Sequence, residues 1–167
     1  MRYGIVLAAI ACGGTTPTWD DVTPTGTTGD TGTPEPVTIQ LDQGDGLACI
    51  FGEGGSGGPY GGYDSDTTFT DGGTTEILVV LENCASGCAY DMTATCSATL
   101  VGSEVQATAS GNYKVPGGNP TCPSMCAVVA ATCDGPTLTT GSWSLVYADP
   151  AAAFDVPSTA TVPCSGR

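Results

Sequence analysis

Cysteine is the residue type in this chain with the clearest capacity for chemistry, because nine cysteines occur in 167 residues and histidine is absent. One cysteine, Cys12, follows a short apolar run, and the other eight lie between Cys49 and Cys164. Without imidazole there is no Ser-His-Asp triad, no Cys-His pair and no histidine ligand for a catalytic zinc ion. The chemistry left to assign is that of the cysteines and of the carboxylates.

The eight cysteines of the body form an even set, which is typical of a disulfide framework in an oxidising compartment. They are Cys49, Cys84, Cys88, Cys96, Cys122, Cys126, Cys133 and Cys164. If the segment between Cys88 and Cys96 is extended, its eight residues at ~3.3 Å each exceed the span of a bridge, so these two must pair elsewhere. We expect up to four disulfides, with cross-pairing between the triplets that begin at Cys84 and Cys122, and with Cys49 paired to Cys164.

A zinc or iron–sulfur site is the alternative role for the two C-x3-C pairs, because such spacings suit thiolate ligation. Thiolate metal sites belong mainly to reducing compartments, which disfavours this interpretation for an exported chain. The Cys-x-x-Cys spacing of redox motifs does not occur in the sequence.

The N-terminal residues have the parts of an export signal: Arg2, an apolar run over residues 3–10 and small residues before a break. The run is too short to cross a bilayer of roughly 30 Å. Ala9-Ile10-Ala11-Cys12 resembles the lipobox of bacterial lipoproteins, with Ala9 where leucine is usual. The resemblance implies a signal peptide at residues 1–11, cleavage before Cys12 and acylation of Cys12. Gly13 resembles the sorting pattern for the outer membrane, and an ordinary cleaved signal is the alternative.

Residues 12–37 are expected to be the lipidated cysteine and a disordered tether, because threonine, glycine and proline leave too little apolar surface to offset the entropy of ordering. Residues 38–167 have the usual size of one domain and are long enough to bury a core.

That domain contains strand patterns and no convincing helical period. Residues 104–110 alternate apolar and polar side chains, and residues 142–147 place Trp143, Leu145 and Tyr147 on one face. Further expected strands, separated by Gly-, Pro- and Asp-rich turns, lie at residues 37–41, 77–81, 90–95 and 128–132. The expected fold is all-β, an antiparallel β-sandwich stapled by disulfides, of which an immunoglobulin-like arrangement is one form.

The second half of the chain has a weak internal repeat, in which residues 88–96 and 126–133 share their cysteine, alanine and threonine pattern. Duplication and two similar hairpins are both open interpretations. This half also resembles uncharacterised Cys-rich bacterial lipoproteins with a lipobox-like signal and a Thr/Pro/Gly-rich tether. The resemblance is carried by Cys126, Ala131-Thr132-Cys133, Leu138, Gly141-Ser142-Trp143-Ser144-Leu145-Val146-Tyr147 and Val156-Pro157-Ser158. It implies no particular activity.

Acidic residues outnumber basic ones by 17 to 3, for a net charge of −14. So few cations cannot neutralise phosphates, which excludes nucleic acid as a partner and a basic face for anionic lipids. Contact with a membrane is therefore expected through the lipid anchor alone.

Two loops carry candidate ligand groups. Asp64, Asp66 and Asp71 offer oxygen ligands for Ca²⁺, although Phe69 and Thr75 stand where an EF-hand needs glycine and glutamate, so a plain polar turn is the favoured interpretation. Residues 57–63 form a glycine-rich loop with Tyr60 and Tyr63, whose rings suit a glycan or protein surface.

We expect a cell-envelope lipoprotein, a structural or binding module displayed from the outer membrane or cell surface with a protein or glycan partner and no catalytic activity. The alternative is a carboxylate-dependent hydrolase of envelope or extracellular glycans. A surface coat without a specific ligand is a third possibility.

Overall fold

A computed structural model gives the structure of the chain. It describes residues 9–11 (backbone only), 34–42, 46–53, 55, 65–118 and 120–166. The strands are β1 (Ala9–Ala11), β2 (Val37–Leu41), β3 (Leu47–Phe51), β4 (Asp66–Phe69), β5 (Glu76–Ala85), β6 (Tyr90–Val101), β7 (Glu104–Val115), β8 (Met125–Asp134), β9 (Gly141–Val146), β10 (Ala152–Val156), β11 (Ser158–Thr161) and β12 (Cys164–Gly166). Within the described residues there is no helix that is long and apolar enough to cross a membrane.

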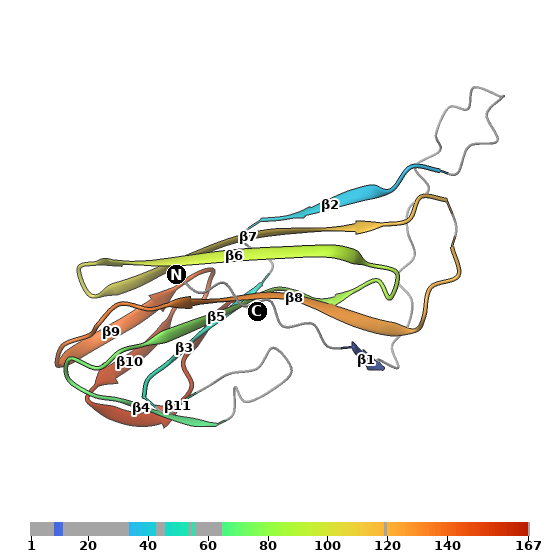
Figure 1. Cartoon of the computed structure of the whole chain (residues 1–167). Coiled ribbons are helices and arrows are strands. Elements are labelled where there is room, and N and C mark those ends of the chain that lie inside the picture. The colour runs from blue at the N-terminus through green and yellow to red at the C-terminus, as the bar shows by residue number, and fades with distance from the viewer. Residues whose placement is uncertain are drawn as a thin grey trace.

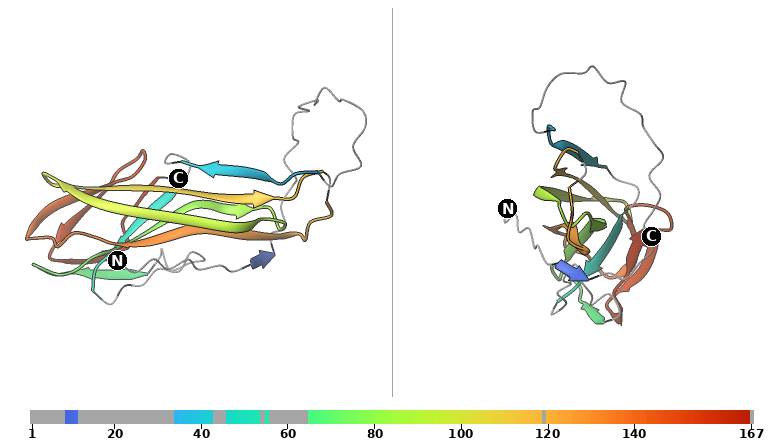
Figure 2. Two further views of the ribbon diagram at one scale, coloured as in Figure 1. Left: turned by 45° about the horizontal axis from the view of Figure 1, so that its top comes forward. Right: turned by 90° about the vertical axis from the view of Figure 1, so that its right-hand side faces the viewer.

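The strands form two main sheets and a small β4–β11 ribbon. One sheet has the order β1-β8-β5-β3-β12, and the other has the order β10-β9-β7-β2, with β6 on the opposite edge of β7. All pairings among the described strands are antiparallel except that of β7 with β9. Figures 1 and 2 show the long β6–β7 hairpin lying along β8. The predicted all-β sandwich is confirmed, and the finer immunoglobulin-like order stays a prediction.

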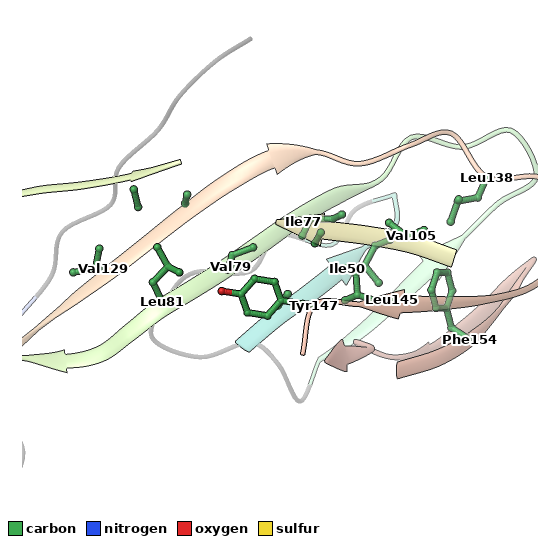
Figure 3. Close-up of a cluster of buried hydrophobic side chains, with 14 of the residues drawn as sticks. Ile50, Ile77, Val79, Leu81, Val105, Val129, Leu138, Leu145, Tyr147 and Phe154 are labelled. Carbon is green, nitrogen blue, oxygen red and sulfur yellow. The ribbon is translucent and has the colours of Figure 1, made fainter. Parts of the chain in front are cut away.

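The core lies between the two sheets, and strand periodicity explains how it forms. On β7, Val105 and Ala107 are buried, whereas Glu104 and Thr108 are exposed and Gln106 is half-buried, as a period of two requires. On β5, residues 77–81 are all buried because alternate side chains enter two different apolar clusters. Figure 3 shows the larger cluster running from Val129 and Leu81 at one end to Leu138 and Phe154 at the other.

Four disulfides staple this sandwich. Cys49 of β3 is bonded to Cys164 of β12, and the two triplets are joined by Cys84–Cys126, Cys88–Cys122 and Cys96–Cys133. The pairing agrees with the predicted cross-pairing and leaves none of these eight thiols for the alternative zinc or iron–sulfur site. Because Cys96 lies on β6 and Cys133 on β8, their bridge closes the sandwich along one side.

The strands expected from the sequence are all present, and most are longer than expected. The segments predicted at residues 77–81, 90–95 and 128–132 are the middle or the start of β5, β6 and β8. Leu145 and Tyr147 are buried and Trp143 is partly buried against the same cluster, as the predicted common face requires. The prediction did not include β1, β3, β4, β10, β11 and β12, and β1 falls within the segment predicted to be a signal peptide.

Candidate binding face

Several residues to which the sequence assigned chemistry lie outside the described residues. These are Cys12, Asp64 and the loop at residues 57–63 with Tyr60 and Tyr63. Of the other calcium candidates, Asp66 is exposed on β4. Asp71 is exposed in the turn that follows, where its Oδ1 accepts a hydrogen bond of 2.7 Å from the backbone N–H of Thr140. The structure thus gives Asp71 a partner within the fold, and in the described part of the chain no three Cys, Asp or Glu side chains gather in a way that suits a metal ion.

A row of polar side chains lies on the outer side of the β6–β7 hairpin. Its members are uncharged side chains that occupy every second position of both strands, and we call them the polar ladder: Thr93, Thr95, Ser97 and Thr99 of β6 with Gln106, Thr108, Ser110 and Asn112 of β7. The register places them directly opposite one another as Thr93 with Asn112, Thr95 with Ser110, Ser97 with Thr108 and Thr99 with Gln106. Residues opposite one another in an antiparallel pair share a face, so these four pairs form one continuous row.

Hydroxyl groups within the polar ladder interact across the strands. Ser97 Oγ and Thr108 Oγ1 lie 2.8 Å apart, and Thr95 Oγ1 lies 3.4 Å from Ser110 Oγ. All four side chains are exposed. A hydroxyl has one donor and two acceptor sites, so each of these groups keeps hydrogen-bonding capacity for a ligand.

Two adjoining hollows follow the polar ladder. One, of about 220 Å³, is lined by Gln40, Thr93, Ala94, Thr95, Ser110, Gly111 and Asn112. The other, of about 410 Å³, is lined by Thr95, Cys96, Ser97, Thr108, Ala109 and Ser110. Because Thr95 and Ser110 line both, the hollows are two parts of one shallow groove along the hairpin. Gln40 of β2, which pairs with Asn112, extends the groove onto a third strand.

Charged groups flank the polar ladder at both of its ends. At one end, Glu104 Oε2 accepts a hydrogen bond of 3.2 Å from Gln106 Nε2. At the other end, Lys114 Nζ lies 3.0 Å from Asp91 Oδ2. The hydrogen bond and the charge of Asp91 raise the pKa of Lys114, so the cation stays protonated and balances the carboxylate. None of the residues that line the two hollows is charged, on a chain of net charge −14.

An aromatic side chain stands beside the ion pair. Tyr90 is 36% exposed and lies opposite Lys114 in the β6–β7 register. Tyr90 is therefore on the same side of the hairpin as the polar ladder, where its ring is accessible at the end of the groove.

Residues of β7 that face the core pack beneath the polar ladder and fix the position of the hairpin. Tyr113 is nearly buried beneath it, and the pKa of its phenol is raised, mainly by burial and also by the charge of Glu82. At Gly111, an added Cβ would lie 2.6 Å from the carbonyl oxygen of Thr93 and 2.9 Å from Leu81 Cδ1. Glycine thus permits β6 and β7 to approach each other over a side chain from the opposite sheet.

The polar ladder is the feature that the sequence analysis did not identify. The alternation over residues 104–110 predicts a strand with one solvated face, which is the ordinary meaning of such a pattern. The matching alternation of Thr93, Thr95, Ser97 and Thr99 is visible in the sequence, but only the register shows that the two rows coincide.

Comparisons of the whole chain with protein-family models, with curated proteins and with solved structures found no match.

Proposed function

We propose that this chain is a non-catalytic, lipid-anchored binding module of the outer membrane or cell surface, and that the polar ladder binds a neutral glycan. One observation carries the proposal: a continuous, uncharged groove of hydrogen-bonding side chains on an otherwise strongly acidic protein.

The chemistry of the polar ladder suits sugars. Each Ser or Thr hydroxyl both donates and accepts, and the amides of Gln106 and Asn112 add paired donors and acceptors. Sugar hydroxyls present the same mixture of donors and acceptors along the length of a glycan chain. The exposed ring of Tyr90 offers a flat apolar surface for one sugar face at the end of the groove.

The electrostatics favour a neutral ligand. An anionic glycan would approach a protein of net charge −14 against long-range repulsion, whereas an uncharged one would not. The disulfides support an oxidising location, and the lipobox-like signal supports a lipid anchor at Cys12. A tether over residues 12–37 would then hold the groove away from the membrane.

The experiment is a binding titration with cellohexaose, chitohexaose and maltohexaose as neutral probes and with an oligogalacturonate as the anionic one. We expect saturable binding of at least one neutral probe and none of the oligogalacturonate. In the double variant Thr95→Val with Thr108→Val, shape is kept and two hydroxyls are removed. The affinity should fall by roughly tenfold or more, since each lost hydrogen bond is worth about 0.5–1.5 kcal/mol.

The chain contains a matched control for this variant. Thr68 Oγ1 of β4 and Thr159 Oγ1 of β11 lie 3.1 Å apart on a different sheet, so replacing both threonines also removes two cross-strand hydroxyls, here from one pair, away from the polar ladder. Thr68→Val with Thr159→Val should leave glycan binding unchanged. Equal losses in both double variants, or no saturable binding of any neutral probe, would contradict the proposal. Turnover of a bound glycan, abolished by a single Asp→Asn or Glu→Gln change, would instead support the hydrolase.

A further inference from the structure

The outer edge of β8 carries a short strand from the far N-terminal part of the chain. Ala9, Ile10 and Ala11 of β1 pair antiparallel with Ala127, Cys126 and Met125, respectively. On its other side, β8 pairs along its length with β5. Residues 125–127 are therefore the point at which this sheet accepts one more strand.

The seated strand occupies a special position in the sequence, because Ala11 directly precedes Cys12. If the chain is cut before Cys12, as the proposed lipid anchor requires, β1 leaves with the signal peptide. The backbone N–H and C=O groups that β1 satisfies at the edge of β8 then lose their partners. Such an edge is a template for another extended chain.

The acceptor edge is held in place independently of β1. Cys126 is bonded to Cys84 of β5, and Ala127 pairs with Ala85 on the same strand. Next to them, an added Cβ at Gly87 would lie 2.7 Å from the carbonyl oxygen of Met125, which shows how closely the turn after β5 packs against the start of β8. The edge of β8 therefore keeps its shape when β1 is absent.

We propose that the edge of β8 at Met125–Ala127 is a strand-acceptor site, filled by Ala9–Ala11 in the uncleaved chain and, after cleavage, by an extended segment of a partner protein. The amino-acid sequence of the seated strand, Ala9-Ile10-Ala11, indicates the chemistry of the partner segment: an extended, uncharged and apolar stretch. An acidic segment is excluded by the charge of the chain. Met125, which is 46% exposed, offers apolar contact beside the edge. This inference rests on the cleavage step of the proposed function and is independent of the glycan groove.

The experiment compares two forms of the protein that carry Cys12→Ser to prevent acylation: residues 1–167 and residues 12–167, both refolded with four disulfides verified by mass. The first measurement is amide hydrogen exchange at residues 125–127. We expect exchange to be at least about tenfold slower in the longer form, because backbone pairing protects amides. The variant Ile10→Pro in the longer form should lose this protection, and Ile10→Val should keep it, since proline removes a donor and valine suits a strand.

The second measurement adds the strand in trans. The probe is a lysine-flanked peptide that contains Ala9–Ala11, and the matched probe carries Ile10→Pro, so that attraction between lysine and the acidic chain is equal for both. The shorter form should bind the first peptide at least about tenfold more tightly than the second, and binding should restore protection at residues 125–127. The longer form should bind the first peptide weakly, because its own strand occupies the edge.

Equal binding of the two peptides, or equal exchange at residues 125–127 in the two forms, would overturn the inference. Failure of the glycan proposal is distinguishable, because the Thr95→Val and Thr108→Val variant leaves the peptide assay unchanged. Failure of the cleavage step is also distinguishable: the chain recovered from cells would retain residues 1–11, and the peptide assay on the shorter form would be unaffected.

Discussion

Ser165 is a fully buried polar side chain that joins the last strand to the end of β9. Its Oγ accepts hydrogen bonds from the backbone N–H groups of Tyr147 and Ala148, at 3.1 and 3.3 Å, and donates one of 2.8 Å to the carbonyl oxygen of Ala148. One hydroxyl thus satisfies three backbone groups where the chain leaves β9. A buried donor or acceptor without a partner costs more than the hydrogen bond itself is worth, so this position tolerates few substitutions.

We predict that Ser165→Ala lowers the free energy of unfolding by about 1 to 3 kcal/mol, because the change removes the hydroxyl that satisfies buried backbone groups of residues 147 and 148. Urea unfolding with the disulfides intact measures the effect. Ser97→Ala is the control, since Ser97 is exposed and its loss should change stability by less than about 0.5 kcal/mol. Similar values for both variants would show that the three contacts of Ser165 do not stabilise the fold.

At the scale of elements, the disulfides divide into one long closure and a clustered set. Cys49–Cys164 joins residues 115 positions apart. Cys84–Cys126 and Cys88–Cys122 lie next to each other, because the cysteines on each side are only four positions apart in the sequence. Each triplet has a first, a second and a third cysteine. The first cysteine of each triplet is bonded to the second cysteine of the other, and the two third cysteines, Cys96 and Cys133, are bonded to each other. This symmetrical pairing agrees with the internal repeat.

This arrangement predicts unequal contributions from the bridges. Once Cys84–Cys126 is formed, Cys88–Cys122 closes only a small additional ring, so its removal by a pair of Ala substitutions should cost about 2 to 3 kcal/mol in the loop-entropy model. Removal of Cys49–Cys164 in the same way should cost about 4 to 5 kcal/mol, since the loop it closes stays long even with the other bridges present. Guanidinium unfolding of the two double variants tests the order. The reverse order would mean that native-state packing, rather than loop length, sets the contributions.

Much of this element-scale organisation can be predicted from the sequence, because alternation and cysteine spacing are local. The period of two in residues 142–147 places Leu145 and Tyr147 in the core, and the triplet spacing indicates the cross-pairing. β3 was missed because Leu47–Phe51 is a short, nearly continuous apolar run without alternation. β12 was missed because its three residues are a strand only through pairing with β3, more than a hundred positions earlier.

The candidate binding face shows a different limit on what can be predicted from the sequence. Thr93, Thr95, Ser97 and Thr99 form a pattern that any solvated strand can show, and so do Gln106 and Thr108. Their combination into one neutral groove depends on the register of the β6–β7 hairpin and on Gln40, which arrives from β2. The register of two strands and the approach of a third are set by the tertiary fold and are not visible in a local sequence pattern. The sequence therefore predicted the strands but not the site.

At the scale of the whole molecule, the proposed function requires that an acidic sandwich, from a chain with only three cationic side chains, stay attached to a membrane. The lipid at Cys12 must then supply the attachment. Buried acyl CH₂ groups contribute about 0.8 kcal/mol each, so several acyl chains hold a protein for long times, whereas removal of the acylated thiol abolishes the anchor completely.

We therefore predict that Cys12→Ala, expressed in a Gram-negative host, moves the protein from the membrane fraction to the soluble periplasmic fraction, with its four disulfides still formed. Thr15→Ala, in the adjoining tether, should stay in the membrane fraction. Gly13→Asp separates anchoring from sorting, because the resemblance to lipoprotein signals implies that it remains acylated but is retained in the inner membrane. Fractionation on a sucrose gradient with intact-mass measurement distinguishes the three outcomes. If Cys12→Ala remained in the membrane fraction at the mass of the chain cut before residue 12, the anchor would have to lie elsewhere in the chain.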